Sequence, residues 1–259
     1  MFLPLFLLSA CPVNPEGDVA DDTAQTPDTA GDSGTAESAD PVCTEPTEVG
    51  CVDEIILDLS LHDDMVSDGN VENEVDGDDW LSVADASAGG MSGASQNPWL
   101  YLRFTDEGLQ RVDIDDESAL EEMTWHFAAR RYILRLNGGT SGPSCVGGAE
   151  VRGDYAEVTL SDADGAAFAL EDFYTDECEL IEDGSTLSGS IEAVLGAWWE
   201  YGSCVATTGQ AFVLQLDDGR FVKFAVDAYY KGEGQTECND EGITNNESGI
   251  YTFRWQFLE

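Results

Sequence analysis

The segment from Trp125 to Cys145 concentrates the residue types that could bind an anion or a metal. It contains Arg130, Arg131 and Arg135, three of the 10 basic residues in a chain that has 53 acidic ones. Guanidinium groups bind carboxylates through paired hydrogen bonds, and the imidazole of His126 could ligate a metal. The alternatives are structural: arginines that pair with buried carboxylates, and an ordinary histidine on the surface or on a sheet face.

The spacing of these residues indicates which of them point the same way. The segment 125–136 reads as one long strand, and side chains an even number of positions apart share a strand face. We therefore expect Arg131 and Arg135 on one face, where they could clamp an anion, and Arg130 on the other. The glycine-rich stretch 137–142 is typical of a turn that needs positive φ, because no helix start follows it to form a phosphate loop.

Composition and missing motifs restrict the function further. The formal net charge of −43 argues against nucleic acid as a partner. The sequence contains no nucleophile or metalloprotease motif, so we expect no enzyme activity. Acidic residues cluster between Asp63 and Asp79, beside His62, but their spacing does not match a calcium loop, and we expect no metal site there.

The elements that must position these side chains are short strands. Period-two patterns predict strands at 55–59, 99–104 and 251–257. Alternating residues on either side of Asp217-Asp218-Gly219 predict a hairpin formed by 211–216 and 220–230. Long irregular loops are expected around 62–98 and 231–248. The prediction is one β-dominated domain over residues 51–259.

The N-terminal region indicates export. Residues 1–10 are apolar and are interpreted as a lipoprotein signal peptide, because Leu8-Ser9-Ala10-Cys11 resembles a lipobox. Cys11 is then the lipidated residue and the only attachment to the membrane. Residues 11–50 are predicted to form an acidic disordered stalk. This organisation predicts an outer-membrane lipoprotein of the bacterial cell envelope, exposed at the surface.

Six cysteines remain once Cys11 is set aside, which is an even number and fits an oxidising compartment. Six cysteines allow 15 pairings. The preferred set joins neighbours along the chain: Cys43–Cys51, Cys145–Cys178 and Cys204–Cys238.

Several landmarks occur together in an order that resembles the HmuY family of bacterial surface lipoproteins. Residues 98–104 (Pro-Trp-Leu-Tyr-Leu-Arg-Phe) look like the family's early aromatic strand. Residues 125–142 look like its signature W-D-x-A-x-x-R-Y…R-x-N-x-G-x-S-G, with His126 in place of the usual Asp. The remaining matches are Trp199-Glu200-Tyr201, residues 218–223, Tyr229-Tyr230 and residues 251–255. The resemblance covers roughly residues 52–259.

The resemblance implies an all-β, right-hand-shaped antiparallel sheet domain and a role in haem or iron acquisition. In the founding haem binder two axial histidines lie in the stretch corresponding to residues 155–205, which here contains neither His nor Met. If haem binds, its ligation must therefore be non-standard. The candidate iron ligands are His126, Met123, Tyr174 and Tyr201, and the candidate partners of the haem propionates are Arg131 and Arg135.

Two functions remain open from the sequence. One is a lipid-anchored surface protein that binds haem, or another small ligand, and hands it to an outer-membrane receptor. The other is a non-haem envelope protein that uses the same scaffold for structural or protein–protein contacts.

Overall fold

Antiparallel strands in three sheets make up most of the regular structure in residues 42–183 and 191–259, the part of the chain that the computed structural model describes. The six-stranded sheet, in the order β1-β2-β12-β11-β10-β7, contains β1 (Val71–Asp76), β2 (Asp79–Asp85), β7 (Gly147–Val151), β10 (Ala211–Gln215), β11 (Phe221–Tyr230) and β12 (Ser248–Leu258). The four-stranded sheet, in the order β4-β3-β5-β6, contains β3 (Leu100–Thr105), β4 (Gly108–Val112), β5 (Phe127–Arg130) and β6 (Ile133–Leu136). The third sheet pairs β8 (Trp199–Tyr201) with β9 (Val205–Thr207). The expected all-β, antiparallel fold is confirmed.

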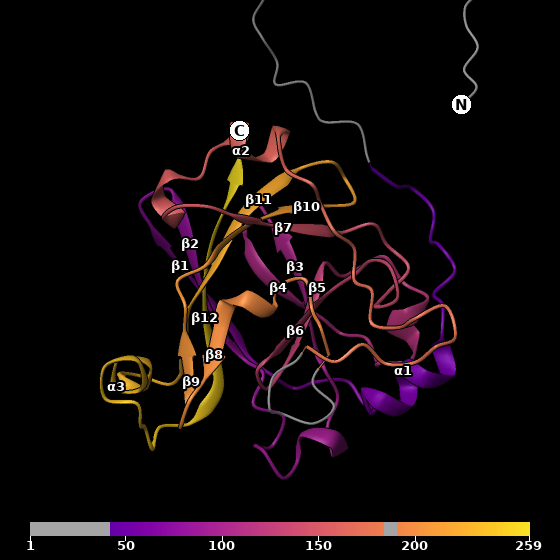
Figure 1. Ribbon diagram of the computed structural model, residues 1–259, viewed down its shortest axis with the longest axis horizontal. Coiled ribbons are helices and arrows are strands. Elements are labelled where there is room, and N and C mark those ends of the chain that lie inside the picture. The colour runs from indigo at the N-terminus through magenta and orange to yellow at the C-terminus, as the bar shows by residue number, and fades with distance from the viewer. Residues whose placement is uncertain (1–41, 184–190) are drawn as a thin grey trace, which may run out of the picture. The chain divides into compact units, whose positions relative to one another are not determined.

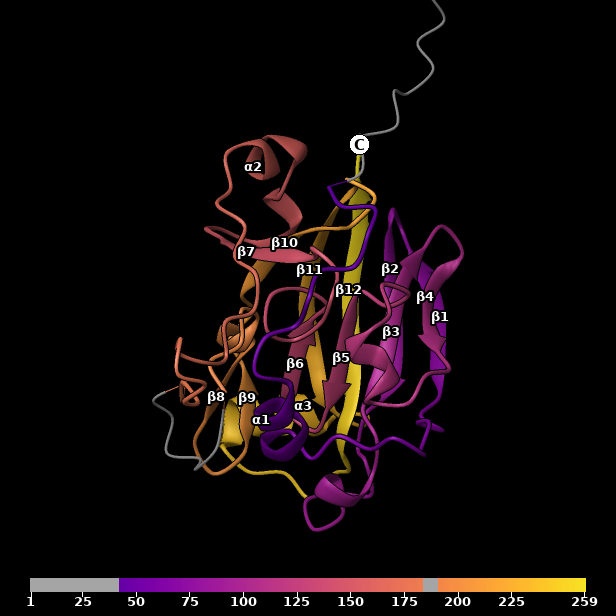
Figure 2. The ribbon, with the colours of Figure 1, turned by 90° about the vertical axis from the view of Figure 1, so that its right-hand side faces the viewer.

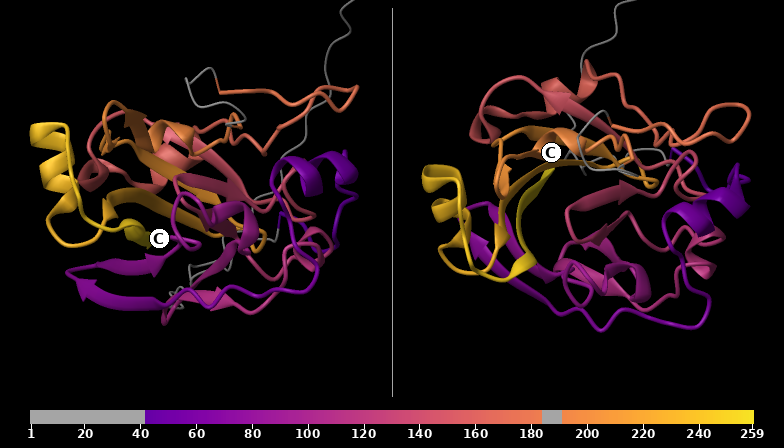
Figure 3. Two further views of the ribbon diagram at one scale, coloured as in Figure 1. Left: turned by 90° about the horizontal axis from the view of Figure 1, so that it is seen from below. Right: turned by 60° about the horizontal axis from the view of Figure 1, so that its bottom comes forward.

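Helices are short and peripheral. The α-helices are α1 (Val52–Asp58), α2 (Leu160–Asp164) and α3 (Gly234–Glu241), and the 3-10 helices are η1 (Ala94–Gln96), η2 (Ser118–Leu120), η3 (Tyr155–Glu157) and η4 (Gly196–Trp198). Figures 1 and 3 show α1 and α3 on opposite sides of the domain. Within the described ranges, none of these helices has the length and apolar character needed to span a bilayer.

The strands β5 and β6 of the four-stranded sheet are largely buried, and this sets the surroundings of the predicted site. Figures 1 and 2 show these two strands between α1 and the strands β11 and β12 of the six-stranded sheet. On one face the Phe127 ring lies 5.6 Å from Phe224 and 5.4 Å from Phe253, both in the six-stranded sheet. On the other face Tyr101 belongs to a second apolar cluster that includes Ile55 of α1. A polar side chain on either face of β5, or of β6 after Ile133, is therefore enclosed by protein.

Residues 55–59 belong to α1 and its C-cap, so the predicted strand there is wrong. Ile55 and Leu59 are both buried, whereas Leu57 is 77% exposed. Buried positions four apart follow the period of a helix, since residues i and i+4 lie on one helical face. The run of apolar residues hid this period from the sequence.

The segment 62–98 is not one irregular loop, because it contains the hairpin formed by β1 and β2. The two strands pair from Val71↔Ala84 to Asp76↔Asp79, and the turn between them includes Gly77 at φ 68°. β1 is an edge strand with mostly exposed side chains, so its acidic residues face solvent. Their polarity concealed the strand. The second expected loop, 231–248, likewise contains α3.

Three disulfides connect distant parts of the domain. They join Cys43 to Cys145, Cys51 to Cys178, and Cys204 to Cys238. The predicted Cys204–Cys238 pair is confirmed, but the predicted pairs Cys43–Cys51 and Cys145–Cys178 are wrong. The error has a physical reason: the bridges span 102 and 127 residues and bring the N-terminal segment and α1 against later loops, which chain proximity does not reveal.

The structured domain begins before residue 51. Val42 donates its backbone N–H to the carbonyl of Asp217 at 2.9 Å, and Thr47 donates to Pro143 at 2.8 Å. Val49 is buried. Residues 42–50, part of the predicted stalk, are therefore held to the domain. The predicted signal peptide, Cys11 and the rest of the stalk lie outside the described residues.

Candidate functional site

The segment 125–136 folds as a hairpin, not as a single strand. β5 and β6 pair in the register Ala128↔Arg135 and Arg130↔Ile133, and Arg131, in the turn between them, has φ 55°. Directly paired residues point to the same face, and Ala128 and Arg130 share a face because they are two positions apart on β5. Arg130 and Arg135 therefore lie on the same face of the sheet. The prediction that Arg131 shares a face with Arg135 is wrong, because the turn breaks the even spacing.

Arg135 lies on the α1 side of the four-stranded sheet and is fully buried. Its guanidinium donates to the Ser141 carbonyl at 2.6 Å, to Ser141 Oγ at 3.1 Å and to Tyr101 Oη at 2.6 Å. The Trp99 and Trp125 rings lie 4.9 and 5.0 Å from it, within cation–π range. Arg135 therefore has no surface at which to meet a haem propionate.

Arg130 completes this buried group. It donates to the carbonyls of Leu59 and Ser60, and its guanidinium lies 4.6 Å from the centre of the Trp99 ring. The nearby acidic group is Asp116, whose carboxylate accepts the backbone N–H groups of Trp99 at 2.9 Å and His62 at 3.1 Å. Burial raises the pKa of Asp116 and lowers the pKa of Arg130 to about 10. We call Trp99, Tyr101, Asp116, Arg130 and Arg135 the buried cationic cluster.

Arg131 is the arginine of this hairpin that reaches the surface. It is half-buried, donates to Ser248 Oγ at 2.8 Å and lies 6.0 Å from the centre of the Tyr229 ring. Its own carbonyl accepts the Tyr251 hydroxyl at 2.7 Å, which holds the turn against the six-stranded sheet. Of the two predicted anion partners, Arg131 is the accessible one.

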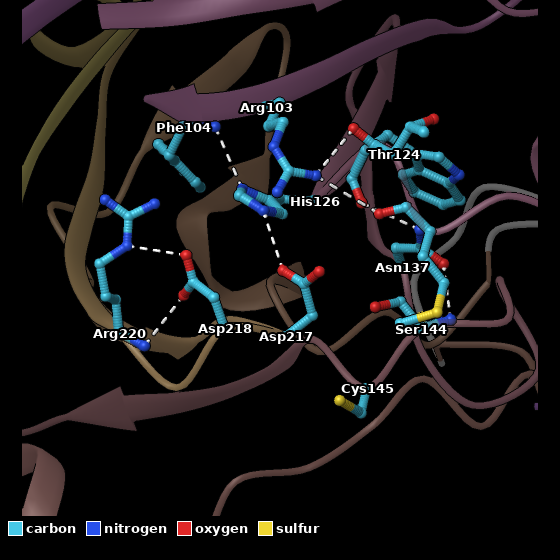
Figure 4. A network of polar contacts seen from close by, with 12 residues as sticks. Arg103, Phe104, Thr124, His126, Asn137, Ser144, Cys145, Asp217, Asp218 and Arg220 are labelled. Carbon is cyan, nitrogen blue, oxygen red and sulfur yellow. Dashed lines mark hydrogen bonds and ion pairs between the residues drawn. The ribbon is translucent and has the colours of Figure 1, made fainter. Parts of the chain in front are cut away.

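His126 is fully buried, so it is neither a surface residue nor an accessible ligand. Its Nδ1 accepts the backbone N–H of Phe104 at 3.1 Å, and its Nε2 lies 3.2 Å from Asp217 Oδ1 (Figure 4). Burial lowers the pKa of His126, while Asp217 acts in the opposite direction. A neutral imidazole whose Nε2–H faces Asp217 fits both contacts. His126 joins the four-stranded sheet to the β10–β11 turn.

The other three candidate iron ligands differ in accessibility. Tyr174 is buried, donates to Asp58 Oδ2 at 3.2 Å and has a pKa raised by burial. Met123 is half-buried, and its carbonyl accepts a hydrogen bond from Arg103 at 3.4 Å. Tyr201, at the end of β8, is 50% exposed. Tyr201 is therefore the most exposed of the four candidates.

Aromatic side chains adjoin Tyr201. Trp199 lies two residues earlier on β8, so the two side chains share a strand face. The Trp199 ring lies 5.0 Å from Tyr132, which directly follows Arg131. Within the part of the chain that the structure describes, the Tyr201 hydroxyl has no hydrogen-bond partner. We call Tyr132, Trp199 and Tyr201 the aromatic strip.

The aromatic strip rests on fixed elements. Trp198, the last residue of η4, is buried against Tyr229 and Tyr251. β9, the partner of β8, follows Cys204, whose disulfide to Cys238 ties it to α3. Tyr132 and Trp199 were present in the motifs of the sequence, but only the fold brings them together, since Tyr132 lies in the β5–β6 turn and Trp199 in β8.

The larger cavities formed by described residues are acidic. A cavity of about 440 Å³ includes Asp64, Asp68 and Asp85 in its lining, and one of about 460 Å³ includes Asp78 and Glu259. A groove of about 650 Å³ has five carboxylates. The depression beside Trp199, by contrast, has a volume of about 20 Å³. Charge makes the large cavities poor sites for an anionic ligand.

One group has metal-ligand types within reach of each other among the described residues: Cys51, Glu54 and Cys178. The two sulfur atoms are bonded to each other, so they offer no thiolate.

Comparison with known proteins gives the family. The family model described as HmuY protein matches residues 95–241, more than half of the chain. No curated protein matches the sequence. Similar solved structures include a Bacteroides fragilis protein classed as a lipoprotein, with 16% identity and a TM-score of 0.42, covering 70% of this chain and 92% of that one. A Bacteroides vulgatus protein classed as HmuY-like and haem-binding has 16% identity and a TM-score of 0.39, covering 69% of this chain and 91% of that one. An apo HmuY analogue of Tannerella forsythia has 15% identity and a TM-score of 0.34, with coverage of 76% and 100%. On the match to the family model, this chain belongs to the HmuY family.

Proposed function

We propose that this protein is a surface lipoprotein, anchored through Cys11 to the outer membrane, that binds haem for haem or iron acquisition with Tyr201 as an axial ligand. The HmuY family supports the class of ligand, since its founding members bind haem. The sequence around Cys11 supports the anchor. An outer-membrane receptor would then accept the ligand.

The observation that carries the proposal is the accessibility of Tyr201. His126 and Tyr174 are buried and engaged with other residues, whereas Tyr201 is 50% exposed beside the ring of Trp199. Tyrosine phenolate is an established haem ligand, and an aromatic wall matches the apolar porphyrin face. Tyr201 thus combines the ligating atom with a surface that suits the macrocycle.

Electrostatics support the same place on the molecule. Haem propionates are anionic, and the carboxylates that line the three large cavities would repel them. Arg131 precedes Tyr132 of the aromatic strip and is half-buried, with its guanidinium held by Ser248. A cation at this position can pair with one propionate. The depression beside Trp199 is small, so the porphyrin would lie across the strip.

A haemin titration followed in the Soret region tests the proposal. The wild-type domain and Tyr174→Phe should both shift the Soret band at micromolar protein, because Tyr174 is buried. Tyr201→Phe should lose this shift while keeping the wild-type circular dichroism spectrum. Tyr174→Phe is the matched control, since both changes remove one phenol hydroxyl.

The non-haem alternative has an observation of its own: two of the four candidate ligands are buried in the core. It predicts no Soret shift for any of the three proteins. That outcome would replace haem acquisition with a scaffold role in protein–protein contacts.

A further inference from the structure

A groove of about 650 Å³ lies between the N-terminal segment, α1 and η2, away from the aromatic strip. Its apolar lining consists of Pro46, Val49, Val52, Ile56, Leu120 and Pro143. Its acidic lining consists of Glu48, Asp63, Asp115, Glu117 and Glu121. We call it the α1 groove. An apolar floor with charge of one sign around it is typical of a protein-recognition surface.

Hydrogen bonds and disulfides within the domain hold the walls of the groove in place without a partner. Thr47 donates from both its N–H and its hydroxyl to the Pro143 carbonyl, at 2.8 and 3.0 Å. The disulfides at Cys43 and Cys51 attach the N-terminal segment and the start of α1 to later loops. Asp115 accepts the Ser118 N–H at 2.9 Å and its hydroxyl at 2.7 Å, which fixes the start of η2. A preformed groove lowers the entropic cost of binding.

Helix α1, which borders the groove, exposes two apolar side chains. Val52, in the lining, is 40% exposed, and Leu57 on the same helix is 77% exposed. Neither side chain belongs to the fully buried core, although Ile55 between them does. Covering these side chains would remove apolar area from water, which favours association.

The negative charge of the α1 groove determines which kind of segment can bind there. The lining contains five carboxylates and no Lys or Arg. The rim therefore offers no electrostatic attraction to an anionic or neutral segment. The chain's own first 41 residues have no basic residue, and a second copy carries the same net charge of −43. Self-occupancy and self-association are both opposed by like-charge repulsion. A positively charged partner would associate faster with the groove, and its charges would fix how it is aligned there.

We propose that the α1 groove docks a basic amphipathic segment of a partner protein, in which Lys or Arg alternates with aliphatic side chains. The aliphatic side chains would contact Val49, Val52 and Ile56. The cationic groups would reach the carboxylates of Glu48, Glu117 and Glu121 at the rim. This contact is separate from the aromatic strip, so the protein could hold a ligand and a partner at once.

The test measures fluorescence anisotropy of a labelled, acetylated peptide of alternating lysine and leucine at physiological salt. The double variant Glu117→Gln/Glu121→Gln should weaken binding about tenfold, because two charge contacts at the rim are lost. The matched control is Glu72→Gln/Glu74→Gln, which removes the same charge from exposed edge strand β1. This control should change the affinity less than about twofold.

Two further arms separate docking from adsorption to a polyanion. Val52→Ser should weaken the peptide about threefold to tenfold by loss of apolar contact. An all-lysine peptide of equal length should bind more weakly than the lysine–leucine peptide. The proposal is overturned if the two charge variants lose affinity equally, if Val52→Ser binds as the wild type does, or if the all-lysine peptide binds equally well. Circular dichroism of each variant confirms the fold.

Discussion

The buried cationic cluster and the aromatic strip hold the two sets of side chains that the sequence offers for binding. In the cluster, the Arg135 guanidinium donates to Ser141 and Tyr101 inside a shell of tryptophans. In the strip, Tyr201 is half-exposed and engages no hydrogen-bond partner among the described residues. Both regions contain residue types that could bind a ligand, but only the side chains of the aromatic strip are accessible to one. The arginines of the cluster serve the fold instead.

The cluster is a framework because the terminal guanidinium nitrogens of Arg130 and Arg135 already donate within the protein. Of the fully buried side-chain nitrogen and oxygen atoms in this group, only Nε of Arg135 lacks a partner among the described residues. A buried arginine needs hydrogen-bond acceptors from the protein itself. Here the carbonyls of Leu59 and Ser60, just after α1, accept from Arg130, and the Ser141 carbonyl in the loop after β6 accepts from Arg135. This arrangement couples the four-stranded sheet to α1. A ligand would have to break those bonds to compete.

Replacing Arg135 should produce the largest effect on stability. Arg135→Ala removes buried hydrogen bonds and leaves a cavity among the aromatic rings, so we expect the free energy of unfolding to fall by about 3–5 kcal/mol. Urea denaturation measures this, with exposed Arg152→Ala as the control. A loss below about 1 kcal/mol would mean that the cluster is not a framework.

Glu171 connects the two regions and should make stability depend on pH. Its carboxylate accepts the N–H of Leu136 in β6 and of Val194, which precedes η4 and β8, both at 2.9 Å. Burial raises the pKa of Glu171 to about 7. Since the unfolded chain has the ordinary, lower value, the native state binds the extra proton between about pH 4.5 and 7. This carboxyl therefore lowers stability as the pH rises through that window, by about 3 kcal/mol in all.

Glu171→Gln stays neutral at every pH and should remove this dependence. Relative to the wild type, its free energy of unfolding should be about 3 kcal/mol higher at pH 8 than at pH 5, because the wild type is destabilised at the higher pH. Urea denaturation at both pH values provides the comparison, and exposed Glu192→Gln is the control. A difference that does not change with pH would contradict the buried, raised pKa.

His126 should affect stability and leave ligand binding intact. His126→Leu leaves the Phe104 N–H and the Asp217 carboxylate without their partner, which should cost about 2 kcal/mol. The midpoint of urea denaturation reports the loss. The Soret titration of the folded variant should match the wild type, and a lost shift would restore His126 as an iron ligand.

Much of the fold was readable from the sequence, because alternating apolar residues identify strands wherever one face is buried. The β10–β11 hairpin around Asp217-Asp218-Gly219 and the terminal strand β12 follow this rule. β1 did not, since its acidic side chains face solvent, and α1 did not, since its apolar run masked the helical period. The sheet face of Arg131 was predicted wrongly, because nothing in the sequence Arg130-Arg131-Tyr132 suggests a hairpin turn.

The site was less predictable than the fold. Tyr201 was among the predicted candidate ligands. Its preference over His126 could not be predicted, because the burial of each side chain depends on packing between sheets. The sequence could not identify Asp116 as the carboxylate of the buried cationic cluster, or Asp217 as the partner of His126, because the chain has 53 acidic residues. Disulfide pairing was equally hidden, because Cys43 and Cys51 find partners more than 100 residues away.

Tyr201→Phe should have the smallest effect on stability and the largest on ligand binding. A half-exposed hydroxyl without a described partner contributes less than about 0.5 kcal/mol, so thermal unfolding should match the wild type. The most direct test of the account is the resonance Raman spectrum of the haemin complex. We predict an iron–phenolate vibration in the wild type and in His126→Leu that is absent from Tyr201→Phe. An unchanged spectrum in Tyr201→Phe, or one typical of imidazole ligation, would contradict the assignment of binding to the aromatic strip.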